Sequence, residues 1–135
     1  MGKFKKILLV LTMLFVGVTA SAQVLKFQAT AYSQRTTNYY GNWSGWSNWT
    51  SCNVPITINM NNDVVTVMSA SPQYYQIYDC TGSYMSGNTS CIDYKFIDQD
   101  GDRGTMTLGM KPSGQSEIYI RFSNVQWAYV VRRIN

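Results

Sequence analysis

The sequence predicts an all-β fold: an eight-stranded antiparallel meander that forms a closed barrel or a barrel-like roll. No stretch after residue 23 repeats its apolar residues with the period of a helix. Apolar and polar residues instead alternate in short runs, which are separated by Gly, Pro, Asn, Asp and Ser. Consecutive runs also pair as hairpins that keep their apolar side chains on one shared face. The same strands packed as a two-sheet β-sandwich are the alternative.

Residues 1–22 are predicted to be a signal peptide. Three lysines form a basic start, residues 7–18 form an apolar run, and Ala20-Ser21-Ala22 supplies the small residues that a signal peptidase requires. The apolar run is shorter than the roughly 20 residues that span a membrane, and no Cys for a lipid anchor lies near the cleavage site. We therefore expect an exported, soluble bacterial protein, periplasmic or secreted, that is not a lipoprotein.

Residues 23–135 are expected to form a single β domain with no membrane span. This length is enough for one hydrophobic core. The full chain has a net charge of +4, but three of its eleven basic residues lie in the signal peptide, which leaves eight basic and seven acidic residues. The basic character of the full chain is therefore no indication of a nucleic-acid partner, and none is expected.

The strands follow one another at short intervals along the mature chain. The first strand is the natural partner of the last, and their pairing would remove both sheet edges. The expected strands lie near residues 24–33, 54–60, 64–70, 73–79, 91–98, 104–110, 116–122 and 125–133.

Each hairpin register is chosen so that apolar residues oppose one another, because a slip of one residue moves every side chain to the other face. In five hairpins the expected pairs include Ile58–Val65, Val67–Tyr75, Phe96–Met106, Leu108–Ile120 and Ile120–Trp127.

The expected register between the fourth and fifth strands predicts a disulfide. If Ile77 opposes Tyr94, then Cys80 opposes Cys91 at the base of a ten-residue loop. Directly opposed cysteines have a separation compatible with a bridge, and export permits one. Cys52 is then unpaired and is expected to be a small buried hydrophobe.

The predicted interior is filled by large rings. An eight-stranded barrel has room only for side chains or one small ligand. We therefore do not expect a roomy lipid cavity. The expected interior rings are Tyr75, Tyr94, Phe96, Phe122, Trp127 and Tyr129.

The sequence carries no catalytic constellation, so we expect a protein that is not an enzyme and needs no cofactor. It contains no His, which removes the commonest general base and most zinc sites. The segment Asp98–Gly104 begins like a calcium loop, but the sixth and twelfth positions hold Arg103 and Gly109 instead of Gly and Glu. No metal site is expected there, and the segment is interpreted as a hairpin turn supplied by Asp-Gly.

The aromatic segment between the first two strands is the candidate binding surface. Long connections in compact domains are usually functional or disordered, and exposed Trp and Tyr dominate binding hot spots. The alternative is that the Trp rings fold back as a lid over one end of the barrel. The candidate ligand-binding residues are Tyr39, Tyr40, Trp43, Trp46 and Trp49.

Residues 42–52, with three Trp followed by a Cys, resemble the opening of a thrombospondin type 1 repeat. The further cysteines and the Arg ladder of that family are missing, so the segment is not assigned to it.

The whole chain resembles a group of short exported β proteins of Bacteroidetes-type gut bacteria. The shared features are a signal ending in Ala-Gln, the Trp-x-x-Trp segment, the Asp-x-Asp-Gly turn and the closing Ile-Tyr-Ile and Trp-x-Tyr. That group has no assigned activity, so the resemblance implies only export and a β fold. The functional hypothesis is a binding module for an unknown glycan or small molecule. The alternative is an exported inhibitor or partner of an envelope protein.

Overall fold

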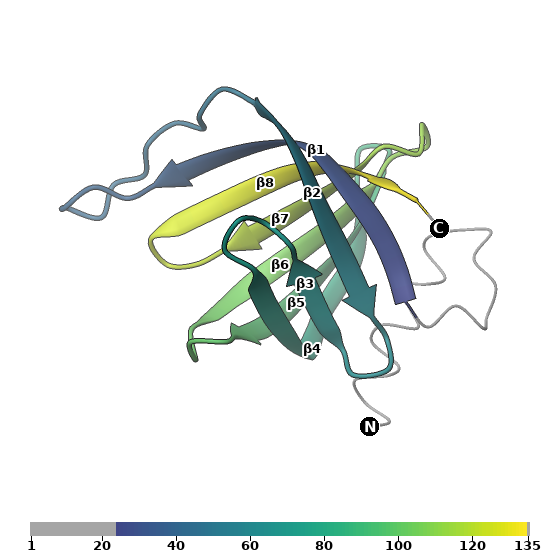
Figure 1. The fold of residues 1–135 in the computed structure, drawn as a ribbon. Coiled ribbons are helices and arrows are strands. Elements are labelled where there is room, and N and C mark those ends of the chain that lie inside the picture. Colours follow the sequence, from purple (N-terminus) through teal and green to yellow (C-terminus); the bar gives the residue numbers. More distant parts are fainter. Residues whose placement is uncertain (1–23, 135) are drawn as a thin grey trace.

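The computed structural model describes residues 24–134 as eight antiparallel strands in meander order (Figure 1). The predicted signal peptide, residues 1–22, lies outside the described residues. Within residues 24–134, no helix is long and apolar enough to cross a membrane. The strands are β1 (Val24–Thr36), β2 (Thr50–Asn59), β3 (Val64–Val67), β4 (Gln73–Ser86), β5 (Thr89–Asp98), β6 (Arg103–Met110), β7 (Ser116–Arg121) and β8 (Val125–Arg133).

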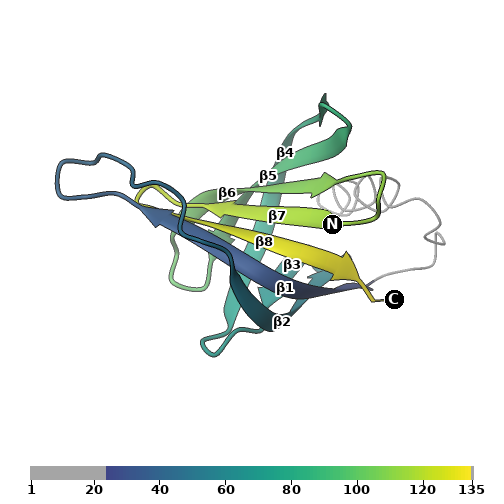
Figure 2. The same cartoon turned by 90° about the horizontal axis from the view of Figure 1, so that it is seen from above.

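The prediction of a closed barrel or barrel-like roll is confirmed. β1 pairs with β2 on one side and with β8 on the other, so the sheet forms a ring. The wall is uneven, because β4 has 14 residues whereas β3 has only four. The connection between β1 and β2 and the tips of β4 and β5 project beyond the ring (Figure 2). We call the end that carries the β1–β2, β3–β4, β5–β6 and β7–β8 connections the mouth.

Two of the predicted registers are confirmed, and three are displaced by two residues. The β2–β3 and β7–β8 pairs, Ile58–Val65 and Ile120–Trp127, are as expected. In the displaced hairpins, Val65 opposes Tyr75, Gly104 opposes Phe96 and Leu108 opposes Ile118. A displacement of two residues leaves each side chain on its predicted face, so the core is preserved.

The displaced β5–β6 register follows from how its connection closes. Between β5 and β6, Asp98 Oδ1 accepts hydrogen bonds from the backbone N–H groups of Asp100 (2.9 Å) and Asp102 (2.8 Å), and the Asp98 N–H donates to the Asp102 carbonyl (2.8 Å). Gly101 adopts a φ of +85°, which favours glycine. The segment is thus the predicted hairpin turn, but it closes between Asp98 and Asp102 and brings Gly104 opposite Phe96.

The predicted Cys80–Cys91 disulfide is wrong. β4 and β5 continue through the expected loop as far as Ser86 and Thr89, and bulges after Ile77 and after Cys80 shift their register. Cys80 consequently opposes Tyr94 and packs against the core, whereas Cys91 opposes Tyr84. The register that would have placed the two sulfurs side by side does not form.

All three cysteines are free thiols. Burial raises the pKa of each of them. Cys52 is half-buried against the core, and its thiol lies 3.6 Å from the carbonyl oxygen of Ala29.

The interior is filled as expected. Tyr75, Tyr94 and Phe96 are fully buried, and the cavity beside Tyr94 measures only about 10 Å³. Such a space holds at most a single water molecule. Toward the mouth the rings form a connected cluster: the centroids of Phe96 and Tyr75 are 4.7 Å apart, and those of Phe96 and Phe122 are 5.4 Å apart. The barrel therefore has no roomy central cavity among its described residues.

Candidate functional site

The aromatic loop, residues 37–49, does not lie as a lid over the mouth. It runs back along the end of β1, where the Ser44 N–H donates to the Thr36 carbonyl and the Ser47 N–H donates to the Gln34 carbonyl, both at 2.8 Å. The loop therefore projects from the ring beside the last residues of β1 (Figure 2). Its three Trp side chains retain between 37% and 54% of their exposure, Trp49 the most. The lid interpretation is wrong.

Arg35 holds two of these rings in place. Its guanidinium carbon lies 5.1 Å from the ring centroid of Trp43 and 4.9 Å from that of Trp46, within the range of a cation–π contact. Its Nε donates a hydrogen bond of 2.8 Å to Gln126 Oε1 on β8. The indole planes are thus fixed by a residue outside the aromatic loop.

The alternation of β1 alone would have placed Arg35 inside the barrel with Leu25 and Phe27. The bulge between Ala29 and Ala31 reverses the alternation, so Arg35 lies on the outer face. Sequence reasoning missed Arg35 because nothing in the local pattern marks this bulge.

An open cleft of about 230 Å³ lies between the aromatic loop and the outer face of the barrel. Trp46, Trp49 and Tyr119 form its sides, and the centroids of Trp46 and Tyr119 are 6.3 Å apart with their planes at 74°. Small residues, Ser33 and Ala128, leave room at its base, and Ala128 is paired with both Tyr119 and Ser33 in the sheet. We call this space the tryptophan cleft.

Hydrogen bonds anchor the tryptophan cleft to β1. The Ser33 hydroxyl donates to the Ser47 carbonyl at 2.6 Å, and Ser47 Oγ accepts from the Gln34 N–H at 3.0 Å. Because Ser47 stands between Trp46 and Trp49, these bonds fix the backbone between the two rings. The cleft is therefore a preorganised surface feature.

Charged and hydroxyl groups continue from Tyr119 across the outer face. The Tyr119 hydroxyl donates to Glu117 (2.8 Å), which also pairs with Lys111 (2.9 Å). Burial acts to raise the pKa of Glu117, but these two hydrogen bonds outweigh it and hold that pKa below its usual value. Burial, with the hydrogen bond to Glu117 next, raises the pKa of Tyr119 to about 12. Tyr119 is thus a neutral hydroxyl group at physiological pH.

A second series of hydrogen-bonded side chains begins at Arg121. Its Nη1 donates to Thr107 Oγ1 (2.7 Å), and the Thr107 hydroxyl donates to Asp93 Oδ1 (2.6 Å). The Arg121 guanidinium also lies 5.2 Å from the ring centroid of Tyr119. Donors and acceptors are therefore arranged beside the tryptophan cleft in fixed positions.

Tyr39 and Tyr40 lie apart from the cleft. They occupy the tip of the aromatic loop, a turn closed by the hydrogen bond from the Asn38 N–H to the Asn42 carbonyl (2.9 Å). Their rings contact each other edge to face, and they are 96% and 83% exposed. The five predicted site residues thus lie in three places. Trp46 and Trp49 line the cleft, Trp43 stacks on Arg35, and Tyr39 and Tyr40 lie at the tip of the loop.

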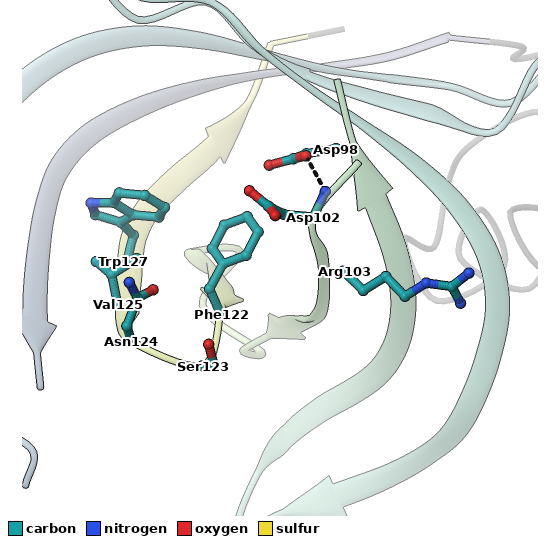
Figure 3. Close-up of a pocket in the computed structure, with 8 residues that line it drawn as sticks. All are labelled: Asp98, Asp102, Arg103, Phe122, Ser123, Asn124, Val125 and Trp127. Carbon is teal, nitrogen blue, oxygen red and sulfur yellow. Dashed lines mark hydrogen bonds between the residues drawn. The ribbon is translucent and has the colours of Figure 1, made fainter. Parts of the chain in front are cut away.

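A second cavity, of about 350 Å³, opens inside the mouth (Figure 3). The rings of Phe122 and Trp127 and the carboxylates of Asp98 and Asp102 face it, whereas the Arg103 side chain extends away from the group. The Trp127 indole N–H donates to Gln34 Oε1 at 3.0 Å. Within residues 24–134, no group of three or more metal-ligating side chains is present. We call this space the mouth cavity.

Comparison with known proteins finds no family model that matches the chain, and no match among the curated proteins or the solved structures.

Proposed function

We propose that this protein is an exported, non-enzymatic binding module whose ligand occupies the tryptophan cleft. The observation that carries the proposal is that Trp46 and Trp49 stay half-exposed beside an open cleft while their backbone and neighbours are held by hydrogen bonds and stacking. Rigid aromatic side chains give contact area at a low cost in conformational entropy. Export is supported by the signal-like residues 1–22, and the absence of His argues against general-base catalysis.

The chemistry around the cleft favours a saccharide. Indole faces pack against the C–H faces of a sugar ring, and the neighbouring Tyr119, Glu117 and Arg121 groups offer donors and acceptors to its hydroxyls. The volume of about 230 Å³ is below that of drug-sized pockets and suits one ring of a longer glycan. An open cleft also lets the rest of the glycan chain extend past the site.

The tip of the aromatic loop favours a second candidate, an inhibitor or partner of an envelope protein. Tyr39 and Tyr40 project almost fully exposed, and two exposed Tyr rings on a projecting turn suit insertion into a concave partner. In this case the tip, and not the tryptophan cleft, would carry the affinity.

A glycan array and an envelope pull-down with matched variants distinguish these functions. Trp46→Ala combined with Trp49→Ala removes both cleft walls, and Tyr39→Ala combined with Tyr40→Ala removes two aromatic rings of the same loop outside the cleft. We expect the first double variant to weaken glycan binding by about 30-fold, the loss typical of hot-spot residues. The second should leave glycan binding unchanged.

Circular dichroism establishes that both double variants are folded. Unchanged glycan binding by the folded cleft variant would refute the cleft as the site. Capture of one envelope protein that depends on Tyr39 and Tyr40, without glycan binding, would support the second candidate instead.

A further inference from the structure

We propose that the mouth cavity is a second binding site, and that it takes a small organic cation carrying an ammonium or guanidinium group. The site comprises Phe122 and Trp127 as an aromatic wall and Asp98 and Asp102 as the charged rim. It is separate from the tryptophan cleft and does not depend on the function proposed for that cleft.

The aromatic wall is rigid and faces the opening. Phe122 and Trp127 contact each other edge to face with centroids 6.0 Å apart, and the Phe122 centroid lies 5.4 Å from that of the fully buried Phe96. The hydrogen bond to Gln34 fixes the Trp127 indole from the β1 side. Both residues are only partly buried and line the cavity, so part of each remains available to a ligand. Indole is the best aromatic partner for a cation.

The rim carries two carboxylates and one guanidinium, because Arg103 also lines the cavity. Figure 3 shows both carboxylates directed to the side where the two rings lie, and Arg103 directed the other way. The Arg103 guanidinium stacks on Tyr78, 5.5 Å from its ring centroid. Among the described residues, neither Asp98 nor Asp102 forms an ion pair with Arg103 or another basic side chain.

The Asp98 carboxylate is fixed by the turn that it closes. Its Oδ1 already accepts two backbone hydrogen bonds, which hold the carboxylate in place before any ligand arrives.

The dimensions restrict the ligand to a small head group. The mouth cavity measures about 350 Å³, near the lower limit of small-molecule sites, which favour the mouths of β-barrels. Behind it the aromatic cluster closes the interior, where only about 10 Å³ remain. An acyl chain or a large ring cannot pass this point. A compact cation fits, with its charge at the rim and its alkyl groups on Phe122 and Trp127.

Isothermal titration calorimetry on the purified protein tests the proposal with choline, free arginine and the peptide Ala-Arg-Ala as probes. The perturbing variants are Asp102→Asn and Trp127→Phe, and the matched control is Asp100→Asn. Asp100 is an acidic residue of the same loop but does not line the cavity. We expect each perturbing variant to weaken cation binding by about tenfold, and the control by less than about twofold.

The two free probes and the peptide separate the possible sources of the cation. Tighter binding of choline or arginine indicates a small-molecule ligand, whereas tighter binding of Ala-Arg-Ala indicates a basic side chain of a protein; either result supports a cation site. Absence of binding to every probe at about 10 mM by the folded protein would overturn the proposal. Equal losses in Asp102→Asn and Asp100→Asn would also overturn it, as would calcium binding that displaces the probes, because the loop would then be acting as a general anionic or metal site.

The double variant that combines Trp46→Ala with Trp49→Ala should bind these cations as tightly as the unmodified protein does. Failure of the mouth cavity and failure of the tryptophan cleft are therefore distinguishable.

Discussion

Gly104 is the position at which one added methyl group should disturb the barrel most. The register sets Gly104 opposite Phe96, and the Phe96 ring occupies the space that a side chain would need. A Cβ built at Gly104 would lie 2.6 Å from Phe96 Cζ and 2.5 Å from the Arg121 carbonyl oxygen. Neither atom yields easily, because Phe96 is fully buried against Tyr75 and the Arg121 carbonyl belongs to the β7 backbone.

The expected cost of Gly104→Ala follows from these two contacts. Overpacking a well-packed core typically costs about 1–3 kcal/mol, and two simultaneous overlaps argue for the upper part of that range. The reduced entropy of the unfolded Ala variant offsets about 0.4–1 kcal/mol. The net loss of unfolding free energy should be about 2 kcal/mol, which lowers the melting temperature of a domain this size by roughly 10 °C.

Urea and thermal denaturation followed by circular dichroism measure this loss. Gly82→Ala is the matched control, since a Cβ there has no neighbour within 4 Å and its φ is not positive, so its stability should change by less than about 0.5 kcal/mol. In a Phe96→Leu background the cost of Gly104→Ala should fall by about 1 kcal/mol, because one of the two overlaps is removed. A Gly104→Ala variant as stable as the unmodified protein would refute the β5–β6 register.

Two further predictions concern titratable groups. Glu117→Gln should lower the unfolding free energy at pH 7 by up to about 1 kcal/mol, because it removes the ion pair with Lys111. Since the folded-state pKa of Glu117 is lowered, its contribution is complete above the usual Glu pKa and is lost as the pH falls through the folded value. The difference in urea midpoint between the unmodified protein and Glu117→Gln should therefore be smaller at pH 3 than at pH 7, and an equal difference at both pH values would contradict this. Thiol titration in guanidinium without reductant should find three reactive cysteines per chain, all slow to react in the native protein at pH 8 because burial raises each thiol pKa. A count of one would demonstrate a disulfide, and peptide mapping of that disulfide to Cys80 and Cys91 would contradict the β4–β5 register.

The sequence predicts which face of the sheet a side chain occupies better than it predicts the register between paired strands. A side chain's face depends only on the alternation of the strand, so Ile77, Tyr94 and Ile118 are inside as expected. The register depends on where a connection closes, and the hydrogen bonds of Asp98 close the β5–β6 connection one residue earlier than the apolar pattern alone suggests. Shifts of two residues satisfy the same alternation and therefore leave no trace in it.

β-Bulges account for the larger differences between the predicted and the observed positions of side chains. The two bulges of β4 reorganised the environment of Cys80, and the bulge of β1 carried Arg35 to the outer face. A bulge changes alternation at one point, and no residue type in these strands marks that point unambiguously.

The candidate site was predictable in part. The aromatic segment was found because Trp and Tyr cluster in a long connection, and Trp46 and Trp49 do line a cleft. Tyr119 and Ala128 complete it from the opposite end of the chain. The pairing of β1 with β8 was expected, but its register, which sets Ser33 beside Ala128 after the bulge in β1, was not.

The tryptophan indole N–H signals in a ¹H–¹⁵N NMR spectrum test the central claim most directly. The chain has four Trp, of which Trp46 and Trp49 flank the tryptophan cleft and Trp127 lines the mouth cavity. Titration with a saccharide selected on the array should shift the signals of Trp46 and Trp49 in proportion to occupancy and leave that of Trp127 in place. Shifts confined to Trp127, or no indole shift at saturating saccharide, would contradict the assignment of the binding site to the tryptophan cleft.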